Sequence, residues 1–246
     1  AMAAAMSLVL FASQLPIPKF HRRSEFACLI KENEYAIYDG AVEFFTGKTV
    51  LAKDYGQVIK EYQLLGLAAK RATYQGKSFM VGALARLNIN HDQLSPQAKK
   101  VVKDLQLEFP IHNTFYNVLA QAIELVHATE IAGELLKDLV KNLKPEESIA
   151  KKINLIAKAN PKGKTTIGYS VMEAPRGILY DMLEIDRNGI IVKADIITPT
   201  VQFLNNIEQD LKVYLPNLKK LSNQEREQKI KTLIRAYDPC ISCATH

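Results

Sequence analysis

The end of the chain carries the residue types best suited to metal chemistry. Cys240 and Cys243 stand three positions apart, and His246 stands three positions beyond the second cysteine. Thiolates and imidazole are ligands of soft and borderline transition metals, and a two-residue gap lets both sulfurs reach one metal centre. Asp238 can accept a hydrogen bond from a metal-bound group or a nearby cation. Pro239 prevents the preceding helix from continuing, so the pattern predicts a metal site on irregular backbone after a helix.

Two common explanations of a cysteine pair fit this segment poorly. A zinc ribbon needs a second ligand pair, and the chain has no other Cys-x-x-Cys and no His-x-x-x-His. A thioredoxin-type pair opens a helix after a strand, whereas this pair follows a helix. The remaining cysteine, Cys28, lies in an apolar, strand-like segment and is expected to be a small buried residue rather than a ligand. Three cysteines in a chain of this length fit a reducing, cytoplasmic setting in which thiols stay free.

Composition places the chain among ordinary globular proteins. It has 246 residues, of which 48% are hydrophobic and 24% charged, and no apolar run reaches the roughly 18 residues of a membrane span. The net charge is +6. The lysines are scattered without interleaved aromatic residues, so a solvated basic face is expected rather than a nucleic-acid site.

The hydrophobic pattern predicts an α+β fold that is mainly α, with a helical bundle core and two small antiparallel β-sheets. Residues 1–6 resemble a vector remnant, which leaves 7–246 as the protein. The expected parts are a small sheet at about 25–50, a helical core at about 54–160, a hairpin sheet at about 165–198, and final helices with the ligand tail at 203–246.

Several segments can be assigned more closely. A strand pair is expected at 26–37, a helix from Asp54 continuing to 73, a helix at 95–107, a long helix at 113–143 and another helix at 146–159. The Asn188-Gly189 dipeptide predicts a hairpin turn between two strands.

The terminal string, read as Asp238-Pro239-Cys240-x-x-Cys243-x-x-His246, resembles the C-terminal signature of the large subunit of nickel–iron hydrogenases. Segments 81–88, 117–124, 173–177 and 199–200 resemble stretches of the same family. Together, these segments look most like those of the cytoplasmic group of this family, whose partner proteins reduce pyridine nucleotides, a deazaflavin or sulfur compounds. The resemblance covers nearly the whole chain from Ser7 and implies the large-subunit fold.

The resemblance implies a role for each residue of the tail. Cys240 would be a terminal nickel ligand, Cys243 would bridge nickel and iron, and His246 would bind a magnesium ion. In the family a dedicated endopeptidase removes a C-terminal extension after this histidine. The iron would carry cyanide and carbon monoxide ligands supplied by maturation proteins.

The resemblance also assigns residues outside the tail. Arg176, in a Pro-Arg-Gly motif, would sit over the open metal position, where its charge can polarise dihydrogen or act in heterolytic cleavage. The hydroxyl of Thr200, after Pro199, would hydrogen-bond a cyanide on iron. The expected catalytic residues are Arg176, Cys240 and Asp238, with the metal taking the hydride and Cys240 or Arg176 the proton.

The resemblance fails at the other pair of cysteine ligands. The family holds nickel and iron with four cysteines, and its N-terminal Arg-x-Cys-x-x-Cys motif is missing from this sequence. The chain therefore resembles the C-terminal portion of a large subunit. It would need the missing N-terminal half, an iron–sulfur small subunit and maturation proteins (a nickel chaperone and an endopeptidase). The chain alone is predicted to be inactive and to hold little or no nickel–iron. The family histidines near Asp181 and Met182 are also absent, which concerns local proton handling.

Two other functions are weighed against the hydrogenase subunit. The chain could be a non-catalytic, hydrogenase-like scaffold or maturation intermediate that binds a nickel chaperone or partner subunits. It could also be an unrelated helical zinc or nickel protein, in which Arg176 and Cys240 would lie far apart. Arg86, Gln121 and Glu124 are expected to form structural ion pairs or interhelix hydrogen bonds rather than a proton path.

Overall fold

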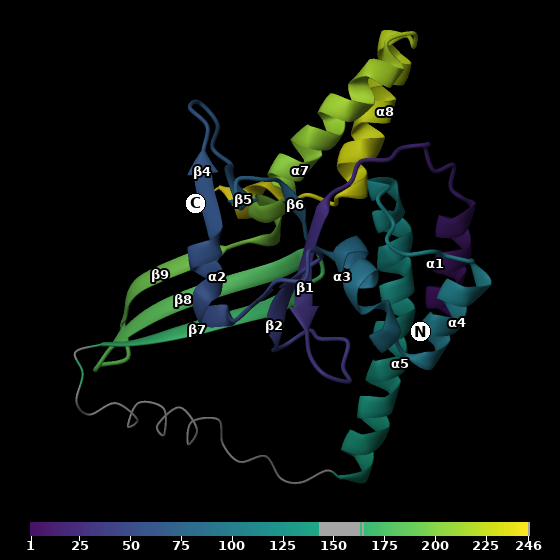
Figure 1. Ribbon diagram of the computed structural model, residues 1–246. Coiled ribbons are helices and arrows are strands. Elements are labelled where there is room, and N and C mark those ends of the chain that lie inside the picture. Colours follow the sequence, from purple (N-terminus) through teal and green to yellow (C-terminus); the bar gives the residue numbers. More distant parts are fainter. Residues whose placement is uncertain (143–162, 164, 246) are drawn as a thin grey trace.

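The computed structural model describes residues 1–142, 163 and 165–245, whose arrangement is shown in Figure 1. The helices are α1 (Met2–Gln14), α2 (Ala52–Val58), α3 (Ala83–Asn90), α4 (Pro96–Asp104), α5 (Asn117–Lys141), α7 (Pro199–Tyr214) and α8 (Asn223–Ala236). Short 3₁₀ turns follow or join them, and the last, η4 (Ile241–Ala244), contains the second tail cysteine. No helix within the described ranges is long and apolar enough to cross a membrane.

The strands of the described residues form three small sheets. The strands are β1 (Glu25–Ile30), β2 (Ala41–Phe44), β3 (Thr49–Val50), β4 (Ile59–Gln63), β5 (Lys70–Tyr74), β6 (Phe79–Met80), β7 (Thr165–Ala174), β8 (Gly177–Asp186) and β9 (Ile191–Ile197). The first sheet has the order β3-β2-β1-β6, with β6 parallel to β1. The second is the antiparallel pair β4-β5, and the third is the antiparallel meander β7-β8-β9.

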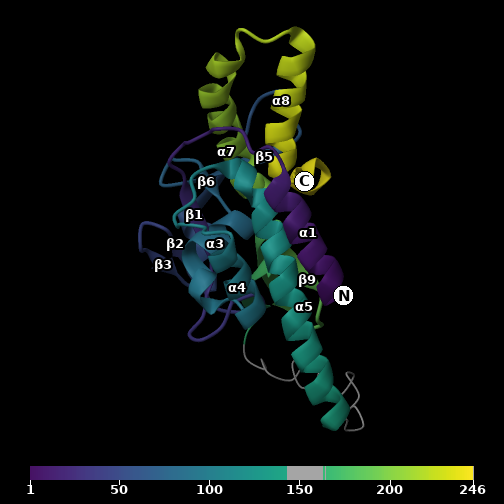
Figure 2. The same cartoon turned by 90° about the vertical axis from the view of Figure 1, so that its right-hand side faces the viewer.

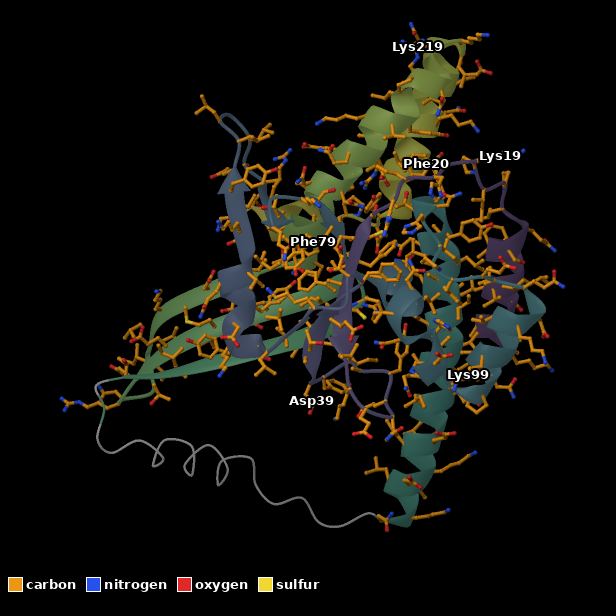
Figure 3. All side chains as sticks on the ribbon, in the orientation of Figure 1. Lys19, Phe20, Asp39, Phe79, Lys99 and Lys219 are labelled. Atoms are coloured by element: carbon orange, nitrogen blue, oxygen red, sulfur yellow. A yellow bond between two sulfur atoms is a disulfide. The ribbon has the colours of Figure 1, made fainter. Side chains whose placement is uncertain are left out.

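α1, α3, α4 and α5 lie on one side of the β1 sheet, and the β7–β9 sheet lies on the other, together with α2 (Figure 1). α5 packs against α1, α4 and α3, and Figure 2 shows α1 running along α5. α7 and α8 form an antiparallel pair that projects from the body. In Figure 3 Lys219 marks the tip of this pair and Phe79 lies in the dense centre. Phe79 is fully buried with Phe26 and Phe44, and the buried cluster to which they belong extends from α3 and α5 through the β1 sheet to β5, β8 and α7.

Local sequence signals account for several boundaries. The Asn113 side chain accepts from the Phe115 backbone N–H just before α5, and Pro96 and Pro199 occupy the first turns of α4 and α7. Asp186 Oδ1 accepts from the N–H groups of Asn188 at 2.8 Å and Ile190 at 2.9 Å, which stabilises the β8–β9 turn. The mixed fold class and the predicted hairpin with its Asn-Gly turn are confirmed. The described residues form three small sheets, however, rather than the two antiparallel ones expected, because the β4–β5 hairpin adds a sheet, and β6 joins the first sheet parallel to β1.

The predicted helix at 54–73 is wrong beyond its first turns. α2 ends at Val58, and the chain then forms the β4–β5 hairpin, with Ile59 opposite Tyr74. Ile59 and Tyr74 are both buried, so this end of the hairpin packs into the core. Gly66, at φ 79°, lies in the loop that joins the two strands.

The predicted strand pair at 26–37 is also wrong in its second strand. β1 pairs with β2 and β6, and the expected second strand is reduced to an isolated bridge between Lys31 and Glu34, just beyond the end of β1. Tyr35 instead turns to the helical layer, where its hydroxyl donates to Glu124 Oε1 at 2.6 Å. A tertiary hydrogen bond therefore replaces the expected strand pairing.

Two helices lack a clear sequence signal. Seven of the eight residues of α3 are buried, so no polar face marks the helical period. α1 begins at Met2 and buries Ala5, so residues 2–6 continue into the same helix as the segment after Ser7. The helix predicted at 146–159 lies outside the described residues.

Candidate metal centre

The tail begins where α8 ends. Tyr237 closes the helix, Asp238 adopts φ 51°, and Pro239 leads into the η4 turn. A non-glycine residue at positive φ is strained, which redirects the chain sharply at this point. The turn brings the Cα atoms of Cys240 and Cys243 to 5.3 Å.

The two tail cysteines form a disulfide. The expectation that the cysteines stay free is therefore wrong for this pair, because their spacing falls within the range that a disulfide requires. The same proximity is what two ligands of one centre need, but the disulfide must be reduced before the sulfurs can bind a metal.

Buried hydrogen bonds hold the start of the tail. The Tyr237 hydroxyl donates to Asp210 Oδ2 at 2.5 Å and accepts from Asn206 Nδ2 at 2.9 Å. Burial beside the Asp210 carboxylate raises the pKa of Tyr237 well above its usual value, so this hydroxyl keeps its proton. Asn117 Nδ2 donates to the Ala236 carbonyl at 2.8 Å. Both α7 and α5 thus fix the residues that precede Asp238.

The first residues of α7 hold both cysteines. The Cys240 N–H donates to Thr200 Oγ1 at 3.0 Å, and the Thr198 hydroxyl donates to the Cys243 carbonyl at 2.9 Å. Thr200 is buried, and because its oxygen accepts from Cys240, its own proton remains available to donate. Pro199, also buried, starts the helix between the two threonines.

Arg176 reaches the tail from a segment 62 residues earlier. It lies in the two-residue turn between β7 and β8, where Ala174 pairs with Gly177. Its Nε donates to the Asp238 carbonyl at 2.7 Å and lies 3.0 Å from the Asp238 carboxylate. About two-fifths of the Arg176 side chain is exposed (41%), so the guanidinium stays accessible to a ligand beside Cys240.

The β7–β8 turn packs directly on the start of α3. A Cβ added to Gly82 would lie 2.7 Å from the Arg176 carbonyl oxygen, and one added to Gly177 would lie 2.9 Å from the Gly82 nitrogen. Both glycines have positive φ, 101° and 135°, which side chains rarely tolerate. Only glycine at both positions allows the two backbones to approach this closely.

A buried ionic network lies one helical turn further along α3. Arg86 binds both oxygens of Glu124 on α5, and its Nη1 donates to Glu173 Oε2 at 2.6 Å. Burial raises the pKa of Glu173, while Arg86 and the Leu29 N–H, which donates at 2.9 Å, oppose that shift. The predicted structural roles of Arg86 and Glu124 agree with these contacts. Glu173 was not singled out in the sequence analysis, although it is the first residue of the 173–177 segment that resembles the family.

Other candidate ligands lie apart from the tail. Cys28 is buried in β1, where Asn90 Nδ2 donates to its sulfur at 3.4 Å, and burial raises the pKa of its thiol well above the usual value. The structure does not describe His246, and the described part of the chain has no cluster of three potential ligands. The described donor set is therefore two sulfurs, which fits one side of a metal centre but not a complete four-thiolate site.

Comparison with known proteins agrees with this arrangement. Residues 28–246 match the family model described as nickel-dependent hydrogenase. The chain is 34% identical over 216 residues to sulfhydrogenase 1 subunit alpha of Pyrococcus furiosus, covering 86% of this chain and 47% of that protein. It is 33% identical over 179 residues to the NAD-reducing hydrogenase HoxS subunit beta of Cupriavidus necator, covering 69% of this chain and 34% of that protein.

Solved structures show the same fold. An NAD⁺-reducing [NiFe]-hydrogenase in its H₂-reduced state superposes with a TM-score of 0.75 at 24% identity, covering 100% of this chain and 56% of that one. A Ni-Fe-Se hydrogenase from D. vulgaris Hildenborough gives a TM-score of 0.62 at 20% identity, covering 99% of this chain and 57% of that one.

The chain spans about half the length of the curated relatives it matches, or less. None of the relatives named above is a maturation scaffold, so they favour a hydrogenase subunit over that alternative. An unrelated metal protein is contradicted, because it required Arg176 to lie far from Cys240, whereas Arg176 binds the residue two positions before it. The family match over most of the chain, together with these contacts, places the chain in the nickel-dependent hydrogenase family.

Proposed function

We propose that this chain provides one side of the nickel–iron centre of a hydrogenase large subunit. One observation carries the proposal: Arg176 is held on Asp238, two residues before Cys240, by a contact between distant segments. After reduction of their disulfide, Cys240 would be a terminal nickel ligand and Cys243 a bridging one. His246 would bind magnesium nearby. The remaining two thiolates would come from the other half of the subunit.

The complete enzyme would cleave dihydrogen heterolytically and reversibly, and would pass electrons to an iron–sulfur small subunit in the cytoplasm. When bound, the nickel–iron centre, with cyanide and carbon monoxide on iron, would supply the Lewis acidity for this chemistry. A nickel chaperone and an endopeptidase would be needed to assemble it.

The chain's own residues would orient the reactants. Held on Asp238, two residues before Cys240, the Arg176 guanidinium would supply a fixed positive charge that polarises dihydrogen, while Asp238 keeps the guanidinium in one orientation. The Cys240 thiolate would take up the released proton, because the Arg176 guanidinium is already protonated and cannot accept one. The free proton of Thr200 would donate to a cyanide on iron.

The test uses the large subunit purified with its partner subunits. Arg176→Lys should lower dihydrogen turnover by roughly 10²- to 10⁴-fold, a typical contribution of a positioned acid–base or electrostatic group, with nickel and iron content unchanged. Arg187→Lys is the matched control, because Arg187 is exposed in the other turn of the same sheet. Normal turnover of fully loaded Arg176→Lys would contradict the proposal.

A second measurement concerns the chain by itself. Purified alone and reduced, it should show no hydrogenase activity and should contain little nickel and iron, because two thiolates cannot hold both metals. It should still bind zinc or nickel weakly. Stoichiometric nickel and iron in this polypeptide would contradict the prediction that its two thiolates are too few to hold both metals.

A further inference from the structure

A buried polar network centred on Arg86 converges on the turn that carries Arg176. Besides its two carboxylate partners, Arg86 donates from Nη1 to the Ala174 carbonyl at 3.2 Å and from Nη2 to the Pro175 carbonyl at 3.0 Å. These are the two residues directly before Arg176. The Arg86 side chain is only 4% exposed, so these bonds form away from water and are not exchanged for bonds to solvent.

The same helix contacts the other side of the turn. Gly82, at the N-cap of α3, lies against the Arg176 carbonyl and Gly177, while Arg86 holds Ala174 and Pro175. One short helix therefore touches every residue from Ala174 to Gly177. α3 is itself fixed to α5, because the Leu84 N–H donates to Asn117 Oδ1 at 3.0 Å.

We propose that α3 sets the position of the Arg176 guanidinium, with Arg86 as the positioning residue. Arg86 does not reach the tail itself. It fixes the backbone that carries Arg176, and Arg176 then meets the Asp238 carbonyl at 2.7 Å. The consequence for dihydrogen chemistry rests on the function proposed above, but the control of the turn by Arg86 does not.

A variant at Glu124 distinguishes the positioning of the turn by Arg86 from a general stabilisation of the fold. Its carboxylate binds Arg86 through both oxygens and accepts from the Tyr35 hydroxyl, and none of these bonds goes to the turn. Glu124→Gln weakens this ion pair and leaves the bonds from Arg86 to Ala174 and Pro175 in place. Arg86→Lys keeps the buried charge, but a single ammonium cannot serve two carboxylates and two carbonyls in the planar fork of a guanidinium.

The experiment is hydrogen exchange by mass spectrometry on the large subunit in its native complex. Arg86→Lys should speed exchange in a peptide spanning 173–179 by roughly ten- to a hundredfold, the effect of losing hydrogen bonds to a charged donor. The peptide spanning 184–191, at the opposite turn of β8, should be unchanged. Glu124→Gln should leave both peptides near the wild-type rate.

Arg71→Lys is the matched control. Arg71 is also buried, also bridges to a carboxylate, Glu208, and also donates to a carbonyl, that of Ala69, but it does not contact the β7–β8 turn. It should leave the 173–179 peptide unchanged. The proposal is overturned if Arg86→Lys does not speed exchange there, if it speeds both β8 turns equally, or if Glu124→Gln has the same effect.

A second variant decides the matter if Arg86→Lys fails to fold. Gly82→Ala keeps the ionic network and pushes a methyl group to 2.7 Å from the Arg176 carbonyl oxygen. It should also speed exchange in the 173–179 peptide, and an unchanged rate would overturn the proposal. In the metal-loaded enzyme, Arg86→Lys should lower kcat with metal content unchanged. If the wild-type complex shows no hydrogenase activity, the proposed function is contradicted. The control of the turn by Arg86 is not, because the hydrogen-exchange rates test it independently of activity.

Discussion

The close approach of the two glycine backbones makes Gly177→Ala a demanding test of the structure. A methyl group at this position would lie 2.7 Å from Val81 Cβ and 2.9 Å from the Gly82 nitrogen, and it would also overlap Val81 Cγ2. Real Cβ atoms do not approach other heavy atoms so closely, so α3 or the β7–β8 turn must shift. The φ of 135° adds a backbone conformation that alanine avoids.

The cost can be worked out from these two effects. A residue held in a sparsely populated backbone region costs about 1–3 kcal/mol, and overpacking a well-packed contact costs about 1–3 kcal/mol. Together they predict a loss of about 4 kcal/mol in the free energy of unfolding, which for a chain of this size corresponds to a fall of roughly 10 °C in Tm. Such a loss is a large part of the roughly 5–15 kcal/mol that stabilises a typical protein.

Urea unfolding followed by circular dichroism measures this loss, and the same sheet offers a control. Gly168, on β7, has no atom within 4 Å of an added Cβ and no positive φ. Gly168→Ala should therefore leave stability unchanged or raise it by about 0.4–1 kcal/mol, because alanine restricts the unfolded chain. If Gly177→Ala is as stable as Gly168→Ala, the described contact between α3 and the turn is wrong.

A double-mutant cycle separates overlap from backbone strain. Val81→Ala removes the methyl group that Gly177→Ala overlaps, so it should cost less in the Gly177→Ala background than in the wild type, by about 1 kcal/mol or more. The part due to φ should not be recovered. Equal costs in both backgrounds would show that steric overlap with Val81 is not the cause.

Three further predictions concern the tail and the core. Tyr237→Phe removes a hydrogen bond to the fully buried Asp210 carboxylate and should lower the free energy of unfolding in urea by about 2 kcal/mol. Tyr38→Phe, at a residue that is 80% exposed, should change it little. Equal effects of the two substitutions would contradict the buried network. Burial lowers the pKa of His127 from 6.5, and its Nδ1 accepts from the Ser95 N–H. The folded state therefore binds fewer protons than the unfolded chain. As a result, the free energy of unfolding should decrease as pH falls from about 6.5 toward the lowered pKa. His127→Gln should reduce the difference between urea midpoints at about pH 7.5 and 5.5, and an unchanged difference would assign it to other groups. After reduction under native conditions, Cys240 and Cys243 should react rapidly with a thiol reagent, while Cys28 should react only in denaturant. In a Cys240→Ser/Cys243→Ser variant, a rapidly reacting thiol would show that Cys28 is accessible, contrary to this prediction.

The sequence by itself determined the residues of the candidate centre. The Pro-Arg-Gly and Asp-Pro-Cys motifs identified the family before any contact was known. Local signals also determined the elements that depend on neighbours in the chain, such as the β8–β9 turn with its Asn188-Gly189 pair and the end of α8 before Pro239.

Only the tertiary structure decided what depends on distant partners. Residues 59–74 form not a helix but a hairpin that packs on α7, and Tyr35 binds Glu124 instead of pairing with a strand, because contacts with distant residues outweigh local preference. The sequence could not show that Arg86 holds the turn of Arg176, since an arginine's partners are chosen by folding. The positions of Arg176, Thr200 and Cys240 relative to one another follow from α3 and α7 packing against the turn and the tail, which no spacing in the sequence encodes.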